Sequence, residues 1–362
     1  MYIPPKFKAT IKNNGAGRSL IKAMRVASGL LRSANVWLTL KVTRVMSSNI
    51  SLTYDPNRKP DGVGAQLQRI FAIHGLCKIA KIRYIHTAIS DVAVHALDPY
   101  QTTADYQKFI SLLDSTFKMK SSEIPKVRKD ISVEHFRART LIYYSLLSIL
   151  KQKHFLLRVS EPYAITDSIS KTYSFVHPLE DNLRIYLNRF ELKSPTIAIH
   201  YRWGVGGKQI QKGESITREL DFEYYSKVVE NIKSLHSSVK YKIVIVTDAP
   251  GKSLVYEPPK EQKSLWVGSP GFSGDKNTIE VSGINMHELF DSLGMEIEVV
   301  SGGSPLDAIA ILANSEHLIM SRSSLSFVAG LLSKTEVYFP ASFWHKPLRN
   351  WHVVNDQDLI RK

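Results

Sequence analysis

The chain has 362 residues, of which 43% are hydrophobic and 22% charged, and these proportions suit two packed domains and argue against disorder. The single cysteine, Cys77, excludes an internal disulfide and a multi-cysteine zinc site, so we interpret it as a core thiol in a reducing compartment. The formal net charge is +15, and we find neither an apolar run of about 18 residues that predicts a membrane-spanning helix nor the pattern of a signal peptide.

Residues 1–54 are expected to form a basic N-terminal extension, because they contain nine lysines and arginines and no acidic residue. Between Arg18 and Met46 these cations alternate with apolar residues. A helix on an anionic membrane surface and an amphipathic helix packed on the protein's own body both fit this pattern, and both interpretations stay open. A nucleic-acid partner is not expected, because zinc-ligand spacing, ribonucleoprotein-like strand motifs and a basic helix leading into heptads are all missing.

The segment Tyr54–Gln66 is rich in turn residues and predicts a linker. After it, apolar residues at helical spacing alternate with short β-rich runs, which predicts a first α/β domain over residues 55–188. The expected elements are a helix over 65–82, a strand over 83–89, and helices over 101–117 and 133–152.

From residue 189 to 345, strands alternate more clearly with helices of about ten residues. This alternation predicts a second domain with a parallel, doubly wound sheet, in which ligands bind outside the carboxyl ends of the strands. Residues 346–362 are expected to form a tail. The expected strands are 196–203, 241–250, 296–303, 317–324 and 335–340, and the expected helices are 221–238, 305–316 and 326–334.

Arg202 lies at the end of the first of these strands and is followed by glycines at positions 204, 206 and 207. A guanidinium at the carboxyl end of a parallel strand, beside residues that let the backbone approach a ligand, suits bidentate contact with a diphosphate. The alternative is an arginine that pairs with a neighbouring acid at the sheet edge.

Two further stretches fit anion binding. Ser321–Ser324 lies between an apolar strand and an apolar helix, where hydroxyls and unpaired backbone amides attract anions, although serine caps also occur without a ligand. Gly62 and Gly64 precede the first strong helix and form either a short ligand-binding loop or a tight turn capped by Asp61. They do not form a dinucleotide fingerprint.

These three stretches, in this order, resemble the fucosyltransferase superfamily, which groups α1,2-fucosyltransferases, α1,6-fucosyltransferases and protein O-fucosyltransferases. The matching motifs are Asp61–Gln66, His200–Val205 and Ser321–Phe327, and the resemblance covers roughly residues 60–345. It implies an α/β, GT-B-like fold in which two Rossmann-like domains face a cleft. The first domain would then be the acceptor side, and the second, residues 189–345, the nucleotide-sugar side.

The resemblance also implies residue roles. Arg202 would contact the donor diphosphate and help the leaving group depart, and Ser323 and Ser324 would hold the β-phosphate. The family needs no metal ion, and this chain has no clustered His/Cys residues along its sequence, so neither a metal nor a cofactor is expected. The predicted donor-binding set is His200, Arg202, Asp248, Asp307, Ser321, Arg322, Ser323, Ser324, Gly62 and Gly64.

An inverting transfer requires the acceptor hydroxyl to lose a proton, and a nearby base can help. The candidates are His74, Asp61, Glu214 and Asp248, none of which has a base-specific context. His74 also fits a buried core histidine, because it lies on the apolar stripe of its helix, and Asp307 fits a helix-N-terminal acid. The predicted catalytic residues are Arg202, His74 and Asp61.

The sequence therefore predicts an inverting, metal-independent glycosyltransferase that moves a sugar, with fucose from GDP-fucose as the first expectation, to a glycan acceptor in surface polysaccharide or glycoconjugate synthesis. Trp203 replaces the family's second arginine, so a transferase with another donor, such as CMP-Kdo or another GDP-sugar, is the first alternative. A non-catalytic carbohydrate-binding protein at the membrane surface is the second. The expected location is cytoplasmic, peripheral at the membrane if the N-terminus binds anionic lipid.

Overall fold

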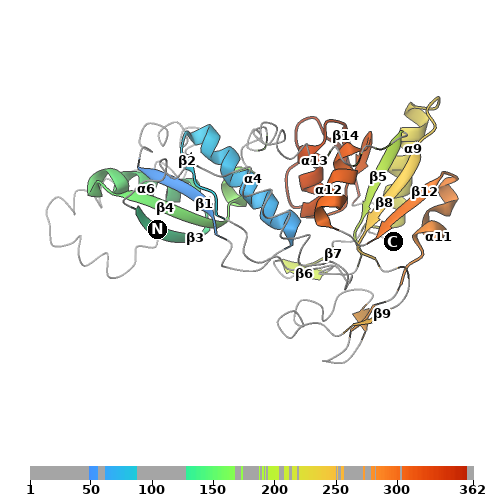
Figure 1. Cartoon of the computed structure of the whole chain (residues 1–362), viewed down its shortest axis with the longest axis horizontal. Coiled ribbons are helices and arrows are strands. Elements are labelled where there is room, and N and C mark those ends of the chain that lie inside the picture. The colour runs from blue at the N-terminus through green and yellow to red at the C-terminus, as the bar shows by residue number, and fades with distance from the viewer. Residues whose placement is uncertain are drawn as a thin grey trace.

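The computed structural model of the chain contains two α/β units (Figure 1). The basic segment before residue 49, Asp61 and the helix expected over 101–117 lie outside the described residues, so the predictions made for them stay predictions. None of the described helices combines the length and the apolar character that a membrane span requires. The described residues are 49–55, 62–87, 128–167, 173, 187, 190, 192, 195–203, 208–211, 214–217, 220–249, 251, 254–256, 272–273, 279–281, 283–301 and 304–356.

The first unit is built on a four-stranded sheet whose neighbouring strands all run parallel. Its elements are β1 (Ile50–Tyr54), α4 (Val63–Ala80), β2 (Arg83–Tyr84), β3 (Arg128–His135), α6 (Ala138–Lys151), β4 (His154–Glu161) and α7 (Tyr163–Thr166). The strand order is β2-β1-β4-β3. Leu52 and its register partner Leu157 are fully buried in the hydrophobic core that also contains the apolar residues of α4.

Two predictions for this unit are wrong. Residues 50–54, assigned to the basic extension, form β1 and pair with β4 along their whole length, so the sheet begins before residue 55. The helix expected over 133–152 begins only at Ala138, because Ile131 and Val133 alternate with polar residues at the period of a strand. The expected strand over 83–89 is confirmed only as the short β2, and β4 is not among the predicted elements.

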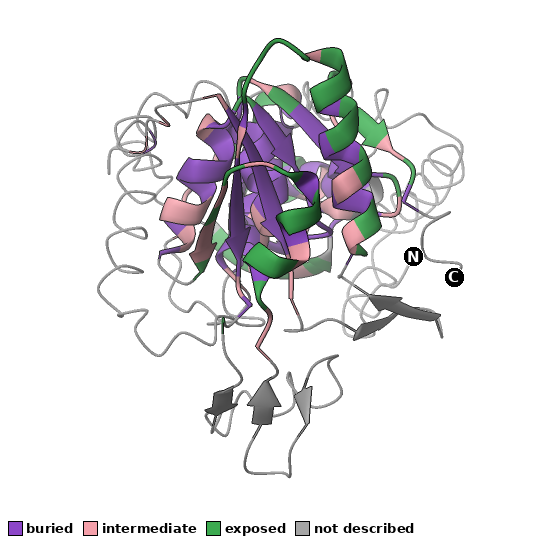
Figure 2. Cartoon of the chain, turned by 90° about the vertical axis from the view of Figure 1, so that its right-hand side faces the viewer, coloured by how far each residue is buried: buried purple, intermediate pink, exposed green. Residues whose placement is uncertain are grey.

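The second unit confirms the parallel sheet expected from the alternation of strands and helices. Its elements are β5 (Thr196–Tyr201), α9 (Phe222–Leu235), β8 (Lys242–Thr247), α11 (Met286–Phe290), β12 (Ile297–Ser301), α12 (Pro305–Asn314), β13 (His317–Ile319), α13 (Ser324–Leu332), β14 (Glu336–Pro340) and β15 (His352–Val354). The strand order is β12-β8-β5-β13-β14-β15. Figure 2 shows that buried residues fill the central strands of this sheet, while exposed residues gather on the outer face of helices such as α9.

The strand β15 corrects the prediction that residues 346–362 form a tail, because His352–Val354 pairs in parallel with β14 and extends the sheet. Two small antiparallel groups are also absent from the predicted elements. One is the hairpin of β6 (Lys208–Gln211) and β7 (Glu214–Thr217), and the other is the sheet of β9 (Leu254–Tyr256), β10 (Phe272–Ser273) and β11 (Ile279–Val281).

The two units pack directly on each other, and one hydrophobic core includes residues from both. Figure 1 shows α4 running from the first unit toward α12 and α13 of the second. The contact is close, because a methyl group placed on Gly64 would lie 2.4 Å from the backbone nitrogen of Leu325. Elsewhere, the rings of Tyr163 and His345 join the units, with their centroids 4.6 Å apart. The prediction of an α/β fold with two Rossmann-like units, each built on a parallel sheet, is confirmed.

Candidate functional site

The predicted donor-binding residues come together mainly at the carboxyl edge of the six-stranded sheet. Because β5, β8 and β13 are parallel neighbours, they end at the same edge. Arg202 follows β5, Asp248 follows β8, and Ser321 lies just beyond β13. In a doubly wound sheet, this edge is where ligands bind.

Arg202 and Asp248 form an ion pair at this edge. The guanidinium nitrogen Nη1 lies 2.6 Å from Asp248 Oδ2, and both side chains are 12% exposed. The backbone N–H of Trp203 donates to the other carboxylate oxygen at 2.8 Å. The sequence left two alternatives for Arg202, a diphosphate contact or a pair with a neighbouring acid, and the second is what the structure contains. A diphosphate that bound here would have to compete with Asp248 for the guanidinium.

His200 and Ser321 form a second pair, which ties the end of β5 to the end of β13. A hydrogen bond of 2.7 Å joins His200 Nδ1 to the Ser321 hydroxyl, and both residues are buried. Burial, assisted by the positive charge of Arg202, lowers the pKa of His200 to about 3, so the imidazole is neutral near pH 7. His200 therefore supplies no charge to a phosphate at that pH, and its direct contact with a donor stays a prediction.

The serine turn after β13 caps helix α13. The Ser323 hydroxyl accepts from the N–H of Leu325 at 3.3 Å, while the Ser326 hydroxyl donates to the carbonyls of Ser321 and Ser323 at 3.2 and 3.0 Å. Ser324 begins the helix and is half-buried. The capping alternative is thus observed for Ser323, while the contact of Ser323 and Ser324 with a phosphate stays a prediction.

Arg322 forms a buried ion pair within the second unit. Its guanidinium donates to Asp356 Oδ2 at 2.9 Å, and both residues are almost completely buried. The backbone N–H and the hydroxyl of Ser342 also donate to the Asp356 carboxylate. This network holds the residues after β15 on the second unit, and a donor contact of Arg322 would require breaking a buried ion pair.

The N-terminus of α4 meets the N-terminus of α13. Gly62 is the N-cap of α4, without a side-chain cap, and Gly64 packs against the backbone of Ser324 and Leu325. Helix N-termini carry partial positive charge, so two that approach each other disfavour the contact unless an anion lies near both. Because an added methyl group on Gly64 would meet the backbone of α13, a glycine is required there for this close approach. Asp61 lies outside the described residues.

Asp307 and His74 lie within helices rather than at strand ends. Asp307 is half-buried in the first turn of α12, as expected for a helix-N-terminal acid. His74 is buried, and its ring contacts Tyr84 edge-on with the centroids 5.4 Å apart. It lies about 15 Å along α4 from Gly64, at about 1.5 Å per residue. The structure therefore supports the core interpretation of His74 over the catalytic one.

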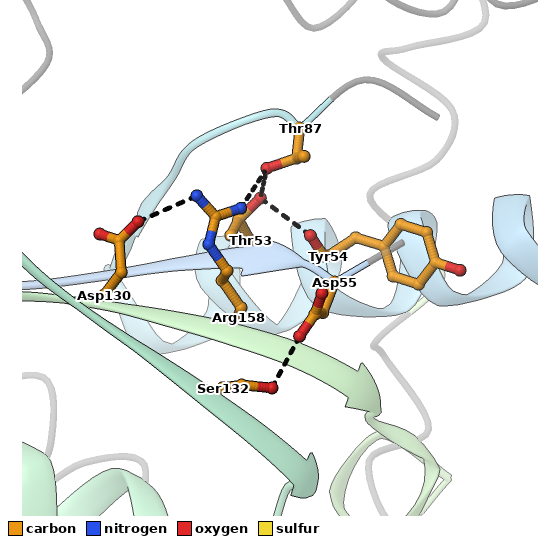
Figure 3. Close-up of polar contacts among 7 residues, drawn as sticks. All are labelled: Thr53, Tyr54, Asp55, Thr87, Asp130, Ser132 and Arg158. Carbon is orange, nitrogen blue, oxygen red and sulfur yellow. Dashed lines mark hydrogen bonds and ion pairs between the residues drawn. The ribbon is translucent and has the colours of Figure 1, made fainter. Parts of the chain in front are cut away.

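The sequence missed a polar cluster on the first unit (Figure 3). Asp55, 5% exposed at the end of β1, accepts a hydrogen bond of 2.7 Å from the Ser132 hydroxyl. On the same face, Arg158 pairs with Asp130 at 3.0 Å and donates to Thr87. The signal was the alternation of polar Ser51, Thr53 and Asp55 with apolar Ile50, Leu52 and Tyr54, which indicates a strand with one polar face.

The buried histidines predict a loss of stability in mild acid. Burial, with Lys78 as a second cause, lowers the pKa of His74 to about 4, while His200 is near 3. In the unfolded chain these histidines have a pKa near 6.5, so below that pH they bind protons that the folded chain does not bind. The free energy of unfolding therefore falls as the pH drops below about 6.5. By pH 5 each histidine should cost about 2 kcal/mol, and His154 and His317, whose pKa values are also lowered by burial, add to this.

Urea unfolding at pH 7 and pH 5 measures this effect. His74→Gln should remove part of the difference in unfolding free energy between the two pH values, because glutamine does not titrate. An unfolding free energy that is equal at the two pH values in the wild-type protein would show that His74 is charged in the folded state. A difference between the two pH values that is the same in the variant as in the wild-type protein would show this too.

Together, the parallel sheet and the residues at its carboxyl edge define the class of Rossmann-like α/β proteins with a polar ligand edge. No family model and no curated protein matches the chain. Among solved structures, it is similar to POFUT1 in complex with GDP, at 11% identity over 79% of this chain and 96% of that chain, with a TM-score of 0.40. It is also similar to the E. coli heptosyltransferase WaaC with ADP-2-deoxy-2-fluoro heptose, at 10% identity over 84% and 93% of the two chains and a TM-score of 0.35. Identities and TM-scores this low assign neither a family nor an activity to this chain.

Proposed function

We propose that this protein is an inverting, metal-independent glycosyltransferase that binds a nucleoside diphosphate sugar at the carboxyl edge of the six-stranded sheet. The observation that carries the proposal is the placement of Arg202 at this edge, beside the His200–Ser321 pair. The residues at this edge belong to the motifs whose order along the chain resembles the fucosyltransferase superfamily. The Arg202 guanidinium, exchanged from Asp248 to the donor, would stabilise the negative charge that develops on the departing diphosphate.

The helix starts of α4 and α13 favour a diphosphate over a single phosphate. Their amide ends approach each other around Gly64. We propose that a donor with two phosphate groups contacts these amides with one phosphate and Arg202 with the other. GDP-fucose is the first donor we propose, on the resemblance, with another GDP-sugar as the alternative. A CMP-sugar, which has one phosphate, fits this arrangement less well.

We propose the first unit as the acceptor side. Asp55 follows the carboxyl end of β1, Arg158 lies on the same face of β4, and hydroxyl-bearing neighbours surround them (Figure 3). Carboxylate, guanidinium and hydroxyl groups are the hydrogen-bonding partners that a glycan requires. The acceptor would be a surface polysaccharide or a lipid-linked glycan, held near the membrane if the basic residues before position 49 bind anionic lipid.

A thermal-shift panel of GDP-, ADP-, UDP- and CMP-sugars tests the donor. A sugar nucleotide present at about 100 times its Kd should stabilise the folded chain by about 2.7 kcal/mol and raise Tm by several degrees. We expect the shift with one diphosphate donor and its loss in Arg202→Ala. If none of the donors raises Tm, the transferase proposal is rejected. Glycan binding without donor turnover would identify a carbohydrate-binding protein.

A further inference from the structure

A cluster of histidine and carboxylate groups lies at the amino edge of the six-stranded sheet, opposite the candidate donor site. It contains His236, which caps the end of α9, His317 at the start of β13, and Glu336 at the start of β14. One ligand atom from each of these residues lies within 4.8 Å of the other two. His317 Nδ1 and Glu336 Oε2 are 3.1 Å apart. The three residues are distant in the sequence, so motif spacing does not reveal them.

The donor set suits zinc. Zinc takes imidazole nitrogen at about 2.0–2.1 Å and carboxylate oxygen at about 2.0–2.2 Å, in a tetrahedron whose ligand atoms lie roughly 3.3 Å apart. The separation of His317 Nδ1 from the Glu336 oxygen is close to one edge of such a tetrahedron. His236 is half-buried at the end of its helix, and its ring centroid lies 5.2 Å from that of His317. A side-chain rotation would bring its nitrogen to a third corner.

Two tyrosines supply the outer contacts that zinc ligands usually have. The Tyr241 hydroxyl lies 3.0 Å from His317 Nε2, the ring nitrogen that faces away from Glu336. If Nε2 carries the proton and donates to Tyr241, Nδ1 is left as a lone-pair ligand. The Tyr338 hydroxyl donates to Glu336 Oε2 at 3.1 Å and orients the carboxylate. The ligand side chains are therefore already held by neighbours on β14 and before β8.

We propose that His236, His317 and Glu336 bind one Zn²⁺ ion, with water as the fourth ligand. The ion would join the end of α9 to two adjacent strands and so stabilise the second unit. Its role would be structural, because His317 begins β13 whereas Ser321 lies beyond the carboxyl end of that strand, up to about 13 Å away. The proposal is independent of the glycosyltransferase proposal and places no metal at the donor edge.

Calorimetric titration of untagged, metal-free full-length protein with Zn²⁺ tests the site. We expect one Zn²⁺ per chain and at least a tenfold weaker affinity in His236→Ala and in Glu336→Gln, which are both mild changes to partly exposed side chains. Tyr241→Phe should weaken binding by about tenfold, the usual effect of losing an outer contact. Zn²⁺ should also raise Tm in the wild-type protein but not in Glu336→Gln.

The matched control is His287→Ala, which removes an exposed histidine on α11 and should leave zinc affinity unchanged. Absence of Zn²⁺ binding in the wild-type protein would overturn the proposal. Equal affinity in the wild-type, His236→Ala and Glu336→Gln proteins would also overturn it, and would leave His317 and Glu336 as a simple ion pair. Arg202→Ala should bind Zn²⁺ normally, so failure of the donor proposal and failure of the zinc proposal are distinguishable.

Discussion

Arg202→Ala should lower turnover of the donor about 100- to 1000-fold, the usual effect of removing one group that stabilises negative charge in a transition state. The guanidinium lies at the carboxyl edge of the sheet beside the His200–Ser321 pair, where we propose the donor diphosphate. Arg202→Lys should retain part of the activity, because an ammonium keeps the charge but loses the bidentate geometry. Release of nucleoside diphosphate from the donor identified by thermal shift measures the effect.

Two controls separate chemistry from folding. Lys242→Ala removes a cation that pairs with Glu296 and Glu298 at the other end of β8, and turnover should change little. Arg202→Ala also leaves the half-buried Asp248 without its cation, which should cost about 1–3 kcal/mol of stability. The double variant Arg202→Ala with Asp248→Asn should recover stability but not turnover. Turnover of Arg202→Ala within threefold of the wild-type value would reject the proposed role.

Gly64→Ala should destabilise the protein by about 3 kcal/mol, at the upper end of the usual cost of overpacking. The added methyl group would lie 2.4 Å from Leu325 N and 2.5 Å from Leu325 Cα, and these backbone atoms can move only if α4 or α13 moves. Helix propensity alone predicts the opposite sign, because alanine is favoured over glycine in a helix by about 1 kcal/mol. The sign of the change in unfolding free energy therefore tests the contact between the two helix starts.

Gly330 and Gly251 are matched controls for this prediction. Gly330 is also helical, but the nearest atom to an added methyl is a ring carbon of Trp351 at 3.0 Å, which can shift, so Gly330→Ala should cost less. Gly251 has open space around it and should tolerate alanine. Chemical denaturation of the three variants gives the comparison. Stabilisation by Gly64→Ala would show that the two helices do not pack this closely in solution.

The second unit follows the sequence more closely than the first. Its strands β5, β8, β12, β13 and β14 and helices α9 and α12 lie within the predicted ranges, because apolar strands and capped helices alternate regularly. Helix α13 begins at Ser324, two residues before its predicted start. In the first unit, β1 follows a basic segment and β3 carries charged residues, so composition obscured their two-residue period. The strand β15 is short and mostly exposed, so its segment resembles a tail in the sequence.

The sequence by itself determined the α/β class, the sheet edge that carries the polar residues, and the place of Arg202 on that edge, because these depend on local periodicity and strand order. Only the tertiary structure decided which side chains pair. It joined Arg202 to Asp248, His200 to Ser321 and Arg322 to Asp356, and these partners lie 34 to 121 residues apart. Such pairs depend on strand register and helix packing, which bring distant residues within a few ångströms and leave no repeat in the sequence.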